Sequence, residues 1–136
     1  MLDPSAFLAE PELIRALEVR SIAISCGEDH IIFRQGDMPV GLYILHRGVA
    51  TLSMASIAGD SIGSVQTTAG SLLGLPALVA NEPYTLTAVA REGSELSFIS
   101  REDFGTLMKA DLAMSLKILR VLAAEVRAAR NAILPS

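Results

Sequence analysis

The spacing of hydrophobic and polar positions changes twice along the chain, which divides it into three zones. Residues 1–18 have the spacing of helices. Residues 19–100 break into short runs that alternate as β-strands do, and glycine-containing turns separate these runs. From residue 101 to residue 136 the spacing is helical again. A series of short strands between two helical ends predicts a mainly β fold, a sandwich or barrel, with flanking helices.

Residues that favour helix starts support the two helical zones. Asp3 or Ser5 is placed to cap a first short helix, and Pro11 stands where a second one begins, since its missing N–H costs nothing at a first helical position. In the last zone, Ser100 is placed to cap a short helix and Asp111 a long one. We therefore expect two short helices at the beginning and a short and a long helix at the end.

The long helix carries an apolar stripe that repeats every seven residues, which is the spacing of a seam between two helices. One interpretation is that the stripe packs on the sheet of its own domain. However, Ile118, Val121 and Leu122 lie off the stripe and are placed to cover that sheet, so the helix has two apolar faces and needs two partners. We expect a homodimer through the stripe, which consists of Leu112, Leu116, Leu119, Ala123, Val126 and Ile133.

The composition narrows the class of protein. A chain of 136 residues with 51% hydrophobic and 19% charged residues fits one folded domain rather than a disordered segment. The net charge of −4 has the wrong sign for a chain that binds nucleic acid directly. Cys26 is the single cysteine, which excludes an internal disulfide and any four-cysteine metal site within one chain. We see neither a signal-peptide pattern nor an apolar run long enough for a membrane span, so a cytoplasmic location is expected.

Candidate catalytic groups are scarce. The sequence has no Ser-His-Asp or Cys-His set with supporting residues, and no His-x-His pair of the kind that β-roll metalloenzymes use. We expect no enzyme activity and no metal site. His30 and His46, with Cys26 and the methionines, could in principle ligate a haem. However, a histidine beside Arg47 and Gly48 is more typical of a turn, so no cofactor is expected.

Two stretches carry a more specific pattern. Residues 30–53, HIIFRQGDMPVGLYILHRGVATLS, contain the order strand, glycine, aspartate, strand, glycine, strand, with Gly36, Asp37 and Gly48 at the turns. Residues 95–108, ELSFISREDFGTLM, follow as a strand and a helix. With the helical ends, this layout resembles the cyclic nucleotide-binding domain of catabolite activator-type and fumarate–nitrate-type bacterial regulators.

The resemblance covers most of the chain and implies a fold. It predicts a double-stranded β-helix, or jelly roll, over residues 19–100, short N-terminal helices over residues 1–18, and C-terminal helices over residues 101–136 that include a long dimerisation helix. Regulators of this family continue into a helix-turn-helix, and residues 1–136 contain none. We expect a single sensor-type domain, either a piece of a longer regulator or a stand-alone module.

The stretch from Ala69 to Glu92, AGSLLGLPALVANEPYTLTAVARE, corresponds in this resemblance to the phosphate-binding cassette. In nucleotide-binding members, a glutamate follows the second glycine and binds the ribose 2′-hydroxyl, but here Leu75 follows Gly74. An Arg followed by Ser or Thr meets the phosphate in those members, and here the pair is Tyr84-Thr85. The cassette is therefore degenerate, and we predict that the domain does not bind cyclic AMP or cyclic GMP in the usual way.

What remains around this turn is an apolar lining with one phenol, suited to a small aromatic, fatty or heterocyclic effector. The resemblance also implies that the long helix closes over the pocket, which adds Ala129 and Arg130, the latter as a replacement for the cation missing at Tyr84. In the alternative interpretation, Leu75 and Pro76 are core residues, Tyr84 is a surface strand residue, and the domain is a dimerising scaffold without a ligand. A sensor of cyclic nucleotide or haem is a further alternative. The candidate ligand-binding residues are Gly74, Leu75, Pro76, Ala77, Tyr84, Thr85 and Arg130.

Overall fold

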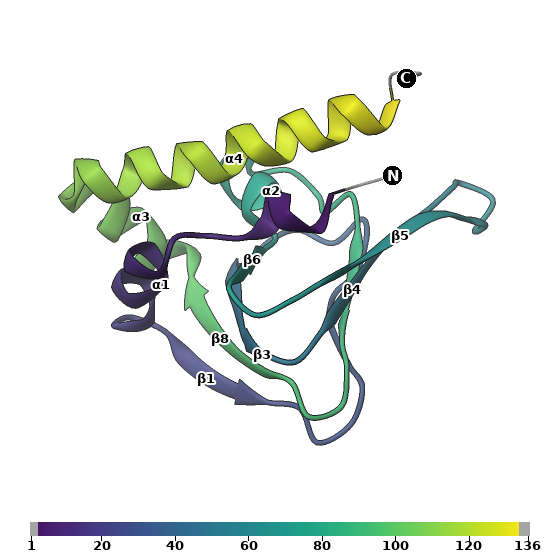
Figure 1. The fold of residues 1–136 in the computed structure, drawn as a ribbon, viewed down its shortest axis with the longest axis horizontal. Helices are drawn as coiled ribbons and strands as arrows, with labels where there is room; N and C mark the ends of the chain where they lie inside the picture. Colours follow the sequence, from purple (N-terminus) through teal and green to yellow (C-terminus); the bar gives the residue numbers. More distant parts are fainter. Residues whose placement is uncertain (1–2, 134–136) are drawn as a thin grey trace.

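The computed structural model describes residues 3–133, and the side chains up to residue 129. Within this part of the chain, eight strands form two four-stranded antiparallel sheets, ordered β1-β8-β3-β6 and β2-β7-β4-β5 (Figure 1). This arrangement confirms the expected jelly roll. The strands are β1 (Ile22–Ser25), β2 (His30–Phe33), β3 (Gly41–Arg47), β4 (Ala50–Ala55), β5 (Ser61–Thr67), β6 (Ser71–Leu73), β7 (Thr87–Ala90) and β8 (Glu95–Ser100).

Helices lie along one side of the roll. Figure 1 shows the long α4 crossing that side, with the short N-terminal η1 and α2 between it and the sheets. The N-terminal helical segment is split at Glu10, and a break at Asp111 separates the last two helices. The helical elements are the 3₁₀-helix η1 (Pro4–Phe7), α1 (Pro11–Glu18), α2 (Leu75–Ala80), α3 (Arg101–Ala110) and α4 (Leu112–Ile133).

The residues expected to start helices do so. Asp3 caps η1 with its carboxylate, and Pro11 is the first residue of α1. The Ser100 hydroxyl accepts a hydrogen bond from the backbone N–H of Asp103 at 3.1 Å, and the Asp111 carboxylate accepts one from the N–H three residues further on at 3.2 Å. These side chains satisfy amide groups that have no partner within their own helix.

Two hydrophobic clusters hold the fold together, and β3 belongs to both. Leu42 and Ile44 are fully buried in the cluster between the roll and the helices, while Leu45 is fully buried in the cluster between the two sheets. A strand that is buried on both faces needs an unbroken apolar run, as this sequence has. The helices α1, α3 and α4 complete the first of these clusters, which we call the helix-side core; among its members are Leu13, Leu17, Leu72, Leu75, Leu78, Ile99, Phe104, Ile118 and Val121.

Four turn glycines adopt a left-handed backbone conformation. Gly36, Gly48, Gly70 and Gly74 all have positive φ, between 88° and 96°. At Gly48 space is also limiting, because a Cβ atom there would lie 2.3 Å from the hydroxyl oxygen of Ser94. The turn between β3 and β4 therefore requires glycine for both reasons.

The helix α4 has the two apolar faces that its sequence predicts. Ile118 and Val121 are 4% and 6% exposed in the helix-side core, and Leu122 packs partly buried against it. The opposite face is exposed, and it carries Leu112, Leu116, Leu119, Ala123 and Val126. Ile133, the last member of the stripe, lies outside the described side chains. No helix in residues 3–133 is long and apolar enough to cross a bilayer.

Charged side chains tie α4 to the start of α1. Lys117 donates a short hydrogen bond to the carboxylate of Glu10 and lies 3.4 Å from that of Glu12, and Arg120 lies 3.3 Å from Glu10. The hydrogen bond from Lys117 lowers the pKa of the Glu10 carboxyl group. Two of the basic residues on α4 are thus neutralised within the domain, which leaves less positive charge on this helix than the sequence alone indicates.

Candidate functional site

The cassette predicted from the sequence forms a turn and a short helix between β6 and β7. Gly74 opens α2 with φ of 88°, and Asn81 ends it with φ of 56°. A Cβ atom on residue 74 would lie 3.0 Å from the ring of Tyr84 and 3.3 Å from that of Phe33. Glycine is therefore needed here both for its backbone conformation and for the close approach of two aromatic rings.

Tyr84 is held in the interior rather than on the surface. Its ring stacks on that of Phe33 with 3.8 Å between centroids and 9° between planes, and the residue is 5% exposed. Its backbone N–H donates to the carbonyl of Asp37 at 2.9 Å, and its carbonyl accepts from the N–H of Gly36 at 2.8 Å. Burial, with a smaller contribution from the nearby Tyr43, raises the pKa of Tyr84 to about 12. Tyr84 therefore forms a neutral, largely apolar wall, and its expected alternative as a surface strand residue is wrong.

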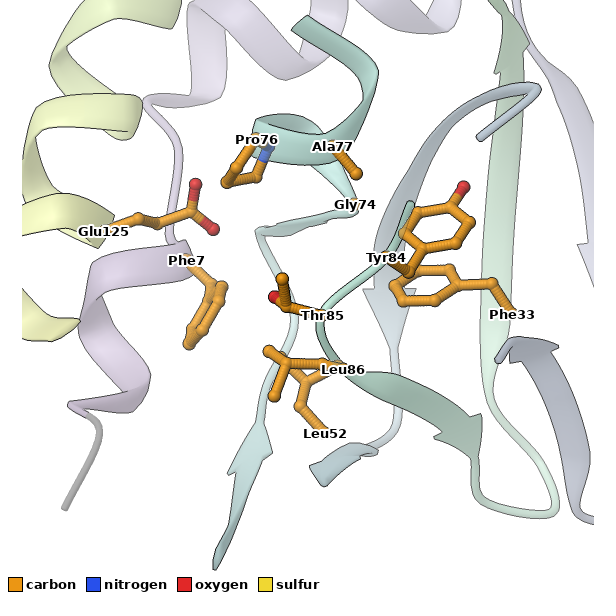
Figure 2. Close-up of a pocket in the computed structure, with 10 residues that line it drawn as sticks. All are labelled: Phe7, Phe33, Leu52, Gly74, Pro76, Ala77, Tyr84, Thr85, Leu86 and Glu125. Atoms are coloured by element: carbon orange, nitrogen blue, oxygen red, sulfur yellow. The ribbon is translucent and has the colours of Figure 1, made fainter. Parts of the chain in front are cut away.

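A cavity of about 60 Å³ opens beside this wall (Figure 2). It is less than half the size of a cavity of roughly 150 Å³ that accommodates benzene. Its walls come from η1, β2, β4, α2, the loop before β7, and α4. The lining residues are Phe7, Phe33, Leu52, Gly74, Pro76, Ala77, Tyr84, Thr85, Leu86 and Glu125. No lysine, arginine or histidine is among them, so the described part of the cavity has no cation for a phosphate.

Glu125 is the residue that sequence reasoning missed. It lies on α4, is 8% exposed, and extends its carboxyl group toward Pro76 and Thr85 with the Phe7 ring beside it (Figure 2). Its Oε2 atom is buried without a hydrogen-bond partner in the described structure. Burial alone raises the pKa of Glu125 to about 8. The signal for it was in the sequence, because Glu125 follows Ile118 by seven residues and therefore shares the face that covers the roll.

Five of the seven candidate residues meet at the cavity, namely Gly74, Pro76, Ala77, Tyr84 and Thr85. Leu75 does not line it. The side chain of Leu75 is fully buried in the helix-side core, because Leu75 and Leu78, three residues apart, share the face of α2 that points away from the cavity. Of these two neighbouring candidates, Pro76 therefore lines the cavity and Leu75 does not.

The described part of the long helix contributes Glu125 to the cavity, which is not among the candidate residues. The side chain of Arg130, the expected replacement cation, lies outside the described side chains, and Ala129 is exposed. Glu125, one turn earlier on α4, is the described helix residue that reaches the cavity. The described part of the helix therefore presents an acid to the cavity, and the contact expected of Arg130 stays a prediction.

The histidines lie away from the cavity. The Nε2 atom of His46 lies 2.5 Å from the hydroxyl of Ser97, and its Nδ1 lies 3.1 Å from the carboxylate of Glu18. Both ring nitrogens of His46 are therefore engaged within the domain. Residues 3–133 contain no cluster of three side chains that could hold a metal ion.

A comparison against protein-family models supports this fold. The cyclic nucleotide-binding domain model matches residues 23–111, more than half of the chain. The chain belongs to the cyclic nucleotide-binding domain family. The resemblance inferred from the sequence is therefore confirmed. Comparison with curated proteins finds no significant match.

Solved structures agree on the fold. The chain is similar to the catabolite activator protein of Thermus thermophilus, with 24% identity and a TM-score of 0.80 over 96% of this chain and 62% of that one. It is also similar to the sensor domain of the transcriptional regulator DNR from Pseudomonas aeruginosa, with 19% identity and a TM-score of 0.68. That match covers 93% of this chain and 85% of the sensor domain. A cyclic nucleotide-binding-like protein from Brucella abortus matches at 27% identity with a TM-score of 0.56. That match covers 74% of this chain and 85% of the Brucella protein. The chain thus spans about three fifths of the length of the Thermus protein.

Proposed function

We propose that this chain is a regulatory sensor domain that does not bind cyclic AMP or cyclic GMP in the usual way and that signals through α4. The observation that carries the proposal is the lining of the cavity. Tyr84, at the place of the phosphate-binding arginine, is stacked on Phe33, and the described wall presents the carboxyl group of Glu125 but no cation. A cyclic phosphate placed here would meet an acidic group in an apolar setting.

The expected loss of nucleotide affinity is large. A hydrogen bond to a charged group contributes about 1.5–3 kcal/mol, so the absence of both the arginine and the glutamate contact corresponds to a few orders of magnitude in affinity. Ionisation of Glu125 would add repulsion between like charges. The cavity volume of about 60 Å³ is also far below that of an ordinary ligand pocket, so a nucleotide would have to lie largely outside the cavity or displace Tyr84 or α4.

The position of α4 supports its role in signalling. One face of the helix closes the cavity through Glu125 and packs on the roll through Ile118 and Val121. The other face exposes the apolar stripe, in which Leu119 is 57% and Val126 is 64% exposed. A ligand that alters how α4 packs on the roll would therefore also alter the arrangement of a dimer formed through the stripe.

Two of the similar structures support a role in transcriptional regulation. The Pseudomonas aeruginosa match is the sensor domain of a transcriptional regulator, and the Thermus thermophilus match is a catabolite activator protein. We extend to this chain the role of a homodimeric regulatory module in the cytoplasm, without catalytic activity and without direct contact to nucleic acid or membrane. The effector is a small molecule that is not a cyclic nucleotide.

A second candidate is a dimerising scaffold without a ligand. The small cavity and the Tyr84 ring packed into the site favour it, since its own side chains already occupy most of the space. The two functions differ in a measurable way, because an effector that binds the folded state raises the melting temperature and a scaffold has no such effector.

The test is calorimetric titration with cyclic AMP and cyclic GMP, followed by a thermal-shift screen of small metabolites. We expect no binding of either nucleotide in the micromolar range. Micromolar binding that is lost in Thr85→Ala would overturn the proposal. Haemin serves as a control in the same screen: a Soret shift that disappears in His46→Ala would assign the haem alternative instead.

A further inference from the structure

Glu125 is the most unusual polar group in the described part of the chain. The residue is more than nine-tenths buried, its side chain points into the cavity, and its Oε2 atom has no hydrogen-bond partner among the described residues. Buried polar atoms in proteins are nearly always hydrogen-bonded, because an unpaired one costs the free energy of its lost hydration. A partner that is not part of the described structure would remove this cost.

Three of the described basic side chains are engaged away from the cavity, and Arg127, on α4, is exposed and does not line it. Lys117 and Arg120 pair with Glu10. Arg101 donates to the backbone carbonyls of Pro39 and Leu78, at 2.7 and 3.4 Å. None of these lines the cavity, where the hydroxyl of Thr85 and the carboxyl of Glu125 are the polar side-chain groups aimed inward (Figure 2).

The shape of the cavity limits what can pair with Glu125. Phe7 and Pro76 flank the carboxyl group, and the stacked rings of Tyr84 and Phe33 form the far wall. Pro76 and Thr85 are themselves exposed, so the space reaches solvent along their side. A volume of about 60 Å³ suits a small headgroup whose remaining atoms extend out of this mouth.

We propose, on the basis of the sensor function above, that this cavity binds a small planar cation of the amidine or guanidine class, with its N–H groups donated to the carboxylate of Glu125. Two parallel N–H groups match the two oxygens of a carboxylate. A planar, delocalised cation is less strongly hydrated than an ammonium group and packs against an aromatic face such as that of Phe7. An anion would find no cation on the described wall and would oppose ionisation of Glu125, and a metal ion would lack further ligands there.

Binding of the cation is linked to a proton. The empty cavity holds Glu125 largely protonated at pH 7, since burial raises the pKa of this group to about 8, so the cation displaces that proton as it binds. Tyr84, the other titratable group on the wall, stays neutral at this pH. Two acids lie at the starts of helices that pack against α4, and both have partners of their own. The Asp3 carboxylate accepts hydrogen bonds from Ser5, and the Glu10 carboxylate pairs with Lys117. Affinity should therefore rise about tenfold per pH unit below pH 8 and level off above it.

The test is isothermal titration of the whole chain with benzamidine and acetamidine between pH 6 and pH 9. We expect binding to the unaltered protein, and a loss of about 10- to 100-fold in Glu125→Gln, which keeps the shape of the side chain but removes its charge. Glu28→Gln, an exposed loop acid, is the matched control and should leave the affinity unchanged. A circular dichroism spectrum of each variant verifies that it is folded.

Several outcomes would overturn the inference. These are an absence of binding by both amidines, equal binding to Glu125→Gln, an affinity that does not depend on pH, or tighter binding of methylammonium or of neutral benzamide than of the amidines. The proposed function is tested separately by cyclic AMP. If neither amidine nor nucleotide binds, only the ligand class is wrong, whereas micromolar binding of cyclic AMP overturns the proposed function itself.

Discussion

Replacing Glu125 by glutamine should change how the stability of the domain depends on pH. The folded-state pKa of Glu125 is raised from 4.5 to about 8 by burial, so folding favours the protonated form. The stability of the unaltered protein is therefore fully present below about pH 4.5 and declines as the pH rises toward 8, where the folded protein must ionise a buried acid. Glutamine does not ionise, so the variant should lack this decline.

The size of the effect follows from the shift. One pKa unit corresponds to about 1.4 kcal/mol, so a shift to about 8 sets an upper limit of roughly 5 kcal/mol. Water entry and small movements of α4 reduce the cost of burying a charge, and we expect about 2–3 kcal/mol. Glu125→Gln should therefore match the unaltered protein within about 1 kcal/mol at pH 5, and be more stable than it by about 2–3 kcal/mol at pH 9.

The assay is urea unfolding followed by circular dichroism at pH 5, 7 and 9, at one fixed protein concentration because a dimer makes stability depend on concentration. Glu28→Gln is again the control and should follow the unaltered protein at every pH. If the difference between Glu125→Gln and the unaltered protein is the same at pH 5 and pH 9, the carboxyl group does not titrate in a buried site, and our account of the cavity is incorrect.

Three further predictions concern the fold and the dimer. If the domain forms the proposed dimer, Leu119→Lys should convert it to a monomer in analytical ultracentrifugation. Ala113→Lys, about 100° around α4 from the start of the stripe, should leave the dimer intact. A dimer that survives both variants would exclude the stripe as its interface. Gly48→Ala should lower the free energy of unfolding by at least about 2 kcal/mol more than Gly36→Ala in urea unfolding. Both glycines have φ near 95°, but only residue 48 lacks space for a Cβ atom. Equal losses of stability in the two variants would contradict this reasoning. In urea unfolding, Tyr84→Ala should lower the free energy of unfolding by about 3 kcal/mol and Tyr84→Phe by less than 1 kcal/mol, because the buried ring stacks on Phe33. Similar losses in the two variants would mean that the hydroxyl group, rather than the ring, stabilises the loop.

The overall fold could be predicted from the sequence because its signals are local. Strand alternation, turn glycines and helix caps each depend on a few neighbouring residues, and Gly48, Pro11 and Ser100 all occupy the positions their chemistry requires. The two faces of α4 were also predictable, because a helix fixes which residues share a side.

The cavity was harder to predict because it depends on which way side chains turn in a very short element. In α2, Leu75 faces the helix-side core and Pro76 faces the cavity, and a helix of six residues offers too little periodicity to distinguish them. The burial of Tyr84 depends on Phe33, which is far away in the sequence. Glu125 was overlooked because a single acid on an otherwise apolar face is easily taken for a solvated one.

The N-terminal segment from Pro4 to Ala9, which begins with η1, lies between α4 and the roll and contacts both the cavity and the start of β6 (Figure 1). Phe7 lines the cavity, the N–H of Ala9 donates to the carbonyl of Gly70 at 2.9 Å, and Leu8 forms an isolated bridge with Ser71. If a ligand binds only while this segment is seated, its apparent dissociation constant equals the intrinsic one divided by the seated fraction. Substitutions that unseat this segment would then lower the affinity for every ligand by the same factor, whatever the chemistry of the ligand. Such a uniform loss would indicate a smaller seated fraction rather than a change in ligand recognition.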